Sequence, residues 1–110
     1  MVDGLSWRKD NYKNPYDYEK KLASKIPDAK REIASGAFSG DYDVTGSVMI
    51  DCKFTDKKSF SLKHDDFEAI CKRSNIDQIP AMAIHYNQFG HSVIILREQD
   101  FIGLMEGQNV

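Results

Sequence analysis

The alternating stretch SVMIDCKF, residues 47–54, narrows the possible folds more than any other part of the chain. Successive side chains of a β-strand point to opposite faces of the sheet, so apolar residues at every second position predict one buried face. The apolar face consists of Val48, Ile50, Cys52 and Phe54. The other face consists of Ser47, Met49, Asp51 and Lys53. The two opposite charges therefore project from the same side of the predicted strand without interrupting its core face.

A first helix is predicted from residue 14 onward, in NPYDYEKKLASKI. Asn14 suits the N-cap, Pro15 suits the first helical position, and Asp17 suits the positive end of the helix dipole. The apolar stripe consists of Tyr18, Leu22 and Ile26, which recur every four residues. We expect Met49 to pack against this helix, and residues 27–33 to add a further helical turn.

The rest of the chain predicts a sheet with one more helix. Strand patterns fall at 41–54, as a hairpin turning at Thr45-Gly46, and at 57–63, 79–86 and 91–97. The segment 64–75 has helical spacing, with acidic residues near its start and basic residues near its end. His85 and His91 flank the turn NQFG, where we expect them to face solvent or to cap polar groups near the turn, and 91–97 is expected as a buried strand. This order predicts an α/β or α+β domain built on one sheet.

Composition sets further limits. A length of 110 residues favours a single domain that spans residues 1–110, with residues 1–13 as a polar arm. The net charge of −2 provides no overall basic field, so any nucleic-acid contact needs a local basic patch. The two cysteines lie in apolar patterns and form no C-x-x-C pair, which favours a reducing compartment. With no signal-peptide pattern and no membrane-spanning run, we expect a cytoplasmic protein.

Carboxylates on one face of a strand are candidate metal ligands. Asp51 lies two residues from Lys53, and a hairpin would bring Asp43, eight residues upstream, beside it. Asp41 is the alternative at nearly the same place. Glu19 shares a helix face with the apolar stripe, where it could point over the sheet. Carboxylate oxygens suit Mg²⁺, and a lysine beside them can orient a water or neutralise a phosphate.

The acid-x-Lys pattern alone is weak. It also occurs at Glu19, Asp28 and Asp56, in helical or loop-like surroundings. An exposed ion pair between Asp51 and Lys53 would contribute little to stability and need no function. The strand context and the second carboxylate distinguish the site at residue 51 from the others.

These residues resemble the PD-(D/E)xK nuclease superfamily, and within it the archaeal- and phage-type Holliday junction resolvases. The resemblance rests on a helical Glu19, on Arg31 four residues before the Ser35-Gly36 pair, and then on the hairpin acids and lysine. It spans about residues 15–97. It implies a restriction-endonuclease-like α/β fold with an αβββαβ core, in which helices flank a central mixed five-stranded sheet.

The resemblance also implies an activity and its residues. It implies a Mg²⁺-dependent endonuclease, with Mn²⁺ as a possible substitute, that cuts branched DNA as a homodimer in a bacterial or phage-infected cell. The implied metal ligands are Asp43, Asp51, Glu19 and the main-chain carbonyl of Cys52, and Lys53 completes the catalytic set. The implied DNA contacts are Arg31, Ser35, Gly36, Lys57, Lys58, Lys63 and His64. Two alternatives stay open: a restriction-like or nicking nuclease for duplex DNA, and an inactive DNA-binding module of the same fold.

Overall fold

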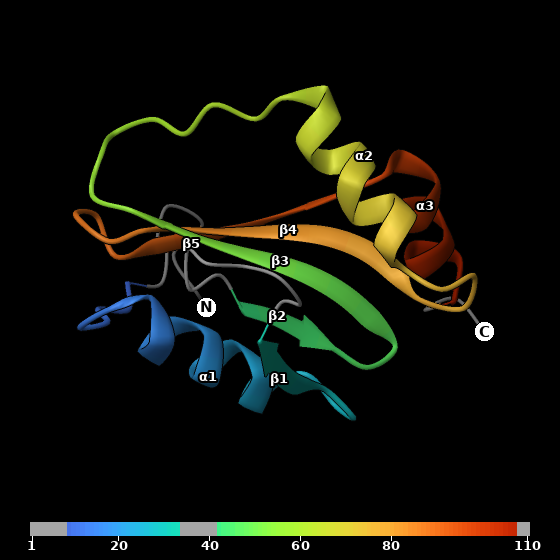
Figure 1. The fold of residues 1–110 in the computed structure, drawn as a ribbon, viewed down its shortest axis with the longest axis horizontal. Helices are drawn as coiled ribbons and strands as arrows, with labels where there is room; N and C mark the ends of the chain where they lie inside the picture. Colours follow the sequence, from blue (N-terminus) through green and yellow to red (C-terminus); the bar gives the residue numbers. More distant parts are fainter. Residues whose placement is uncertain (1–8, 34–41, 108–110) are drawn as a thin grey trace, which may run out of the picture.

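The fold is an α/β arrangement of a mixed sheet with helices on both faces (Figure 1). A computed structural model describes residues 9–33 and 42–107. Within these ranges the helices are α1 (Pro15–Lys25), α2 (His64–Arg73) and α3 (Glu98–Gly107). The strands are β1 (Lys30–Ile33), β2 (Tyr42–Thr45), β3 (Val48–Thr55), β4 (Ile79–Tyr86) and β5 (His91–Leu96). No helix of the described residues is long and apolar enough to cross a bilayer.

The sheet runs in the order β1-β2-β3-β4-β5. Neighbouring strands are antiparallel except β3 and β4, which are parallel. Helix α2 makes the crossover between these two, since parallel neighbours cannot be joined by a tight turn. The α/β class and the mixed sheet confirm the prediction at this coarse level.

Helix α1 begins as its sequence predicts. The Asn14 side chain accepts a hydrogen bond from the backbone N–H of Asp17 at 2.9 Å, and Pro15 is the first helical residue. Tyr18 is buried, with Leu22, Ala23 and Ile26 packed around the same cluster. Cap, proline and apolar stripe therefore act together to fix the start and the orientation of this helix.

Two apolar clusters lie on opposite faces of the sheet. On the α1 face, Tyr18 packs with Val44, Ile50 and Cys52 of the central strands. On the α2 face, the buried residues are Ile70, Met82 and Ile84, with Met49 and Phe60 packed against them. Met49 therefore packs under α2, and the expectation that it would contact the first helix was wrong.

Two segments differ from the predicted elements. Residues 57–63 form no strand, because the chain leaves β3 and arches over the α2 face instead, where Phe60 joins the cluster (Figure 1). Residues 30–33 were expected as helix and form edge strand β1, after Asp28 turns the chain at a φ of 60°. The sheet therefore contains a strand at residues 30–33 in place of the one predicted at 57–63.

Strand β5 differs from its prediction in burial. Residues 91–97 were expected as a buried strand, but the burial of β5 alternates along most of its length and Ile94 is 48% exposed. As the last strand in the sheet order, β5 has one neighbour, β4, which limits how much of it can be covered. His85 was expected to face solvent or to cap polar groups near the turn. It is fully buried in β4, so it does not face solvent, and its Nε2 lies 3.2 Å from Asn87 Oδ1 in the turn.

Candidate functional site

The β2–β3 hairpin brings the two predicted hairpin acids together. In the ladder, Asp43 is the Cα partner of Asp51. Directly opposed residues of an antiparallel pair lie about 4.5–5.5 Å apart at Cα, so the register places the two acidic residues as direct neighbours. The side chain of Asp43, and the whole of the alternative Asp41, lie outside the described part of the structure.

The hairpin turn that sets this register is held on both sides. A Cβ on Gly46 would lie 2.7 Å from the carbonyl oxygen of Asp28, so only glycine fits between the two segments. The Asp28 carboxylate accepts a hydrogen bond from the backbone N–H of Ser47 at 3.4 Å. From the other side, Gln78 Nε2 donates to the carbonyl of Gly46 at 3.0 Å. These contacts fix the turn, and with it the pairing of the two acids.

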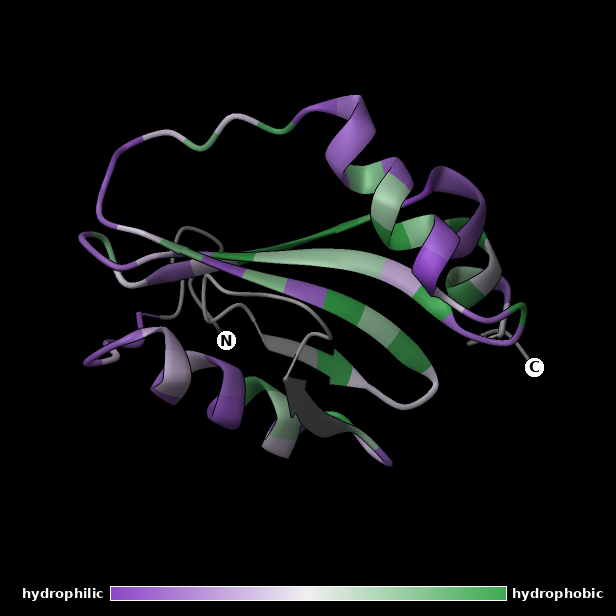
Figure 2. Cartoon of the chain, in the orientation of Figure 1, coloured by the Kyte–Doolittle hydropathy of each residue, from purple (hydrophilic) through white to green (hydrophobic). Residues whose placement is uncertain are grey.

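Asp51 and Lys53 form an ion pair on one face of β3. Lys53 Nζ lies 3.3 Å from the Asp51 carboxylate, and the two side chains are 12% and 27% exposed for Asp51 and Lys53 respectively. Their neighbours in β4 are Met82 and Ile84, which are buried. Figure 2 shows hydrophilic segments interrupting an otherwise hydrophobic β3. An ion pair beside apolar side chains is screened less than one in open water.

Among the residues that the structure describes, the last pair of the β2–β3 ladder is Asp43–Asp51. Cys52 and Lys53 continue β3 beyond that point, paired with β4. This end of the ladder therefore carries two carboxylates, a main-chain carbonyl and an ammonium group. This donor set suits a hard cation such as Mg²⁺, which prefers oxygen ligands. Among side chains that the structure describes, no three His, Cys, Asp or Glu groups gather in a metal-binding arrangement.

Glu19 does not join this face. It is only 2% exposed, within the helix that packs on the α1 face. Asp51 and Lys53 share the alternation of Met49, which packs on the α2 face. The ion pair and the helix that carries Glu19 therefore lie on opposite faces of the sheet. Spacing along the helix could not specify which face of the sheet the helix covers, and Glu19 as a metal ligand stays a prediction.

The predicted DNA contacts lie on several elements. Lys57 and Lys58 follow β3 directly, in the segment that arches toward α2 (Figure 1). Lys63 is the N-cap of α2 and His64 is its first residue, and all four are exposed. Arg31 is in β1, where it is the Cα partner of Val44. Ser35 and Gly36 lie outside the described residues.

No family model, curated protein or solved structure matches this chain. The function must therefore be inferred from the residues themselves.

Sequence reasoning missed a second polar cluster on the α1 face. His85 Nδ1 lies 2.7 Å from Ser92 Oγ, and His85 Nε2 lies 3.2 Å from Asn87 Oδ1. The NQFG turn held the signal, since a hairpin around it pairs His85 with Ser92 across the strands. Nothing in the sequence indicated that Asp10, a residue of the polar arm, would lie beside this cluster.

Proposed function

We propose that this protein is a Mg²⁺-dependent endonuclease that hydrolyses phosphodiester bonds in branched DNA, in the manner of a Holliday junction resolvase. The observation that carries the proposal is the pairing of Asp43 with Asp51 across the hairpin, with Lys53 3.3 Å from the Asp51 carboxylate. Two opposed acids and a lysine at the end of a ladder are the groups that metal-assisted phosphodiester hydrolysis requires.

The arrangement of elements supports the proposal. Along the chain the order is α1, β1, β2, β3, α2, β4, and β4 lies parallel to β3. This is compatible with the αβββαβ order that the nuclease resemblance implies. In such a core the acids are carried on the central hairpin, which here is β2–β3.

The metal ligands in this proposal are Asp43, Asp51 and the main-chain carbonyl of Cys52. A bound Mg²⁺ supplies Lewis acidity at the scissile phosphate and a more acidic water. The protein holds these donors in place, because the ladder fixes the spacing of residues 43 and 51 before any ligand arrives. Preorganised oxygen donors at a fixed spacing are needed by an ion that tolerates little distortion of its geometry.

Lys53 serves the substrate in this proposal. Its ammonium group lies beside Asp51 and retains partial access to solvent, which allows contact with a phosphate oxygen. An ammonium group at that position orients the attacking water and stabilises the negative charge that grows on the phosphate. The basic residues that follow, Lys57, Lys58, Lys63 and His64, together with Arg31, would contact the DNA backbone.

The competing function is that of a DNA-binding module without catalysis. The helix that carries Glu19 packs on the other face of the sheet from Asp51, which favours this alternative because the metal would have fewer charged ligands without Glu19. A restriction-like or nicking nuclease would use the same residues on duplex DNA. That alternative differs from junction resolution in its substrate and not in its site.

A substrate panel tests these functions directly. A four-way junction, a linear duplex and a single strand are each incubated with the protein in Mg²⁺, and again in EDTA. Paired symmetric nicks in the junction alone, lost in EDTA, are the expected result. Cleavage of the duplex would indicate the restriction-like alternative. Binding without product in either condition would contradict the endonuclease proposal.

The variant Lys53→Ala separates catalysis from binding on that panel. It should reduce cleavage at least 100-fold, in line with the loss of one preorganised charge at the reacting phosphate, about 2.7 kcal/mol. Junction binding, measured by gel shift in Ca²⁺, should change far less. Lys72→Ala is the matched control, because Lys72 is an exposed lysine on α2 that pairs with Glu68. Undiminished turnover in Lys53→Ala would refute the assignment.

A further inference from the structure

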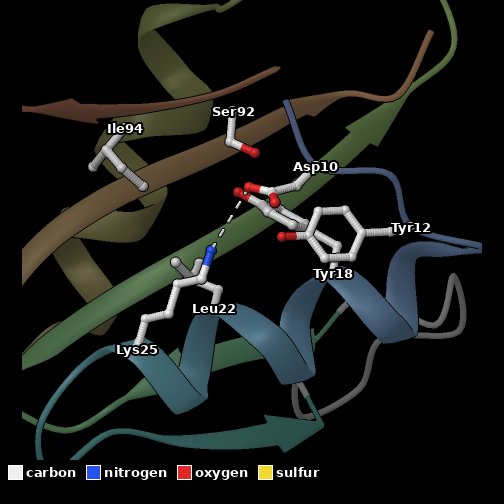
Figure 3. A pocket seen from close by; sticks show the side chains of 7 residues that line it. All are labelled: Asp10, Tyr12, Tyr18, Leu22, Lys25, Ser92 and Ile94. Carbon is white, nitrogen blue, oxygen red and sulfur yellow. Dashed lines mark ion pairs between the residues drawn. The ribbon is translucent and has the colours of Figure 1, made fainter. Parts of the chain in front are cut away.

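A pocket of about 200 Å³ opens between α1 and β5, on the face of the sheet opposite to Asp51 and Lys53 (Figure 3). Its lining comes from the arm, the helix and the edge strand. The lining residues are Asp10, Tyr12, Tyr18, Leu22, Lys25, Ser92 and Ile94. Sites for drug-sized ligands span about 300–1,000 Å³, so this one has room for a single ring system.

Tyr18 supplies a buried hydroxyl to this pocket. The residue is 3% exposed, and among described residues its hydroxyl has no hydrogen-bond partner of acceptable geometry, although Ser92 lies near it. Burial raises the pKa of Tyr18, so the hydroxyl stays protonated and can donate. A buried hydroxyl that is poorly paired is costly, and a ligand with a polar edge would reduce that cost.

The His85 network fixes what Ser92 can offer. Asn87 Oδ1 accepts a hydrogen bond from the backbone N–H of Tyr12 at 3.4 Å, which identifies this atom as the acceptor for His85 Nε2–H as well. In the neutral ring, Nδ1 then accepts from the Ser92 hydroxyl at 2.7 Å. Burial lowers the pKa of His85, which keeps the ring neutral. The Ser92 hydroxyl therefore donates its proton to the hydrogen bond with His85, and the Ser92 oxygen presents lone pairs to the pocket.

One acidic and one basic side chain line the pocket. Lys25 Nζ lies 4.0 Å from the Asp10 carboxylate, and the side chains are 41% and 32% exposed for Lys25 and Asp10 respectively. Such an exposed, long pair is weak, so Lys25 can turn to a ligand at little cost. Asp10 is held in place because its backbone N–H donates to the carbonyl of Gly90 at 2.7 Å.

We propose that this pocket binds one unpaired nucleobase of a DNA strand, with Tyr18 donating to the edge of the base, Ser92 accepting from it, and Lys25 contacting the adjoining phosphate. The apolar walls, Leu22 and Ile94, and the Tyr12 ring match the flat faces of a base. The mixed donors and acceptors match its polar edge. The inference rests on the proposed function, and it adds a site that holds an unpaired nucleotide away from the cleaved phosphate.

The test compares oligonucleotides of equal length and charge. Fluorescence anisotropy measures binding of a fluorescein-labelled oligothymidylate and of its abasic counterpart, in EDTA so that no strand is cut. We expect the abasic strand to bind at least five times more weakly. Equal binding of the two strands, or binding of neither, would overturn the inference. Thymidine and adenosine, followed by ligand-observed NMR, determine whether a free nucleoside is also accepted.

Variants assign the binding to this pocket. Tyr18→Phe removes the hydroxyl and keeps the ring, so we expect about a three- to tenfold loss for the thymidylate and none for the abasic strand. Tyr16→Phe is the control, because Tyr16 lies on the same helix but does not line the pocket. Ile94→Trp, at an exposed wall position, should block the pocket without disturbing the core. If neither variant changes binding, the pocket is not the site.

These outcomes are independent of the cleavage assay. Loss of junction cleavage in Lys53→Ala together with normal base discrimination would support both proposals. Normal cleavage without base discrimination would remove only the nucleobase site. Base discrimination without any cleavage would remove only the endonuclease proposal.

Discussion

Asp51→Asn distinguishes a functional carboxylate from one partner of a structural ion pair. The substitution has two opposite effects on stability. It removes the ion pair with Lys53, and it relieves the repulsion between two acidic residues that are opposed in the β2–β3 ladder. The pair is only partly accessible, with Asp51 12% and Lys53 27% exposed, so it contributes at least as much as an exposed pair, about 0.2–1 kcal/mol. Like charges placed directly opposite each other cost a similar amount, about 0.2–1 kcal/mol.

Because the two effects oppose each other, the free energy of unfolding without metal should change by less than about 2 kcal/mol. If the pair were instead a buried structural element, loss of one partner would cost about 3–5 kcal/mol. Added Mg²⁺ should stabilise only the unmodified protein. At ten times the dissociation constant, binding contributes about 1.4 kcal/mol, which raises Tm by about 5 °C in a domain of this size.

Thermal unfolding followed by circular dichroism, in EDTA and over a Mg²⁺ titration, measures both effects. Asp77→Asn is the matched control, because Asp77 is an exposed aspartate outside the hairpin. The same preparations are assayed for junction cleavage, which Asp51→Asn should reduce at least 100-fold. A loss of about 3 kcal/mol or more in EDTA would refute the reasoning. A Mg²⁺-induced rise in Tm that persists in Asp51→Asn would refute it equally.

Three other substitutions test the fold around the site. Glu19→Gln should keep most of the Mg²⁺-induced rise in Tm, since the sheet separates this residue from the ion pair; loss of the rise would show that Glu19 reaches the metal. Gly46→Ala should cost about 1–3 kcal/mol in urea unfolding, because its Cβ would meet the Asp28 carbonyl at 2.7 Å, and an unchanged midpoint would contradict that contact. Burial lowers the pKa of His85 below 6.5, so the unfolded chain binds a proton that the folded chain does not, and the free energy of unfolding should fall as pH drops through about 6.5. His85→Gln should flatten that slope, whereas His64→Gln, at an exposed position, should leave it unchanged.

The local signals in the sequence predicted the local structure well. Asn14 and Pro15 fixed the start of α1, and the alternation in β3 correctly separated Cys52 from Asp51. The hairpin register pairs Thr45 with Met49, so the turn spans residues 46–48 and lies beyond the expected turn at Thr45-Gly46. These features depend on neighbours within a few residues, so sequence alone contains the information.

Non-local packing was harder to predict. Residues 30–33 have helix-compatible composition, and they became strand β1 because β2 offers them a partner. Residues 57–63 alternate like a strand, but Phe60 is drawn into the α2 cluster and no sheet edge receives the segment. The sequence also did not indicate which face of the sheet α1 covers. Met49 and Glu19 were both assigned by assuming that α1 covers the charged face of β3.

For the candidate site, the sequence predicted that Asp43, Asp51 and Lys53 would lie together, and the register and the ion pair bring them together as described. It did not predict the cluster of His85, Ser92 and Tyr18. That cluster requires the β4–β5 hairpin and α1 to meet on the same face, which no short-range pattern specifies.

Paramagnetic broadening by Mn²⁺ tests the central claim most directly. In ¹H–¹⁵N spectra of the isotopically labelled protein, substoichiometric Mn²⁺ should first broaden the backbone amides of Asp43, Asp51 and Cys52, and excess Mg²⁺ should reverse the effect. In Asp51→Asn the same amides should stay sharp. Broadening confined to another acidic segment, such as Asp65-Asp66 at the start of α2, would show that the hairpin does not bind the cation and would contradict the account.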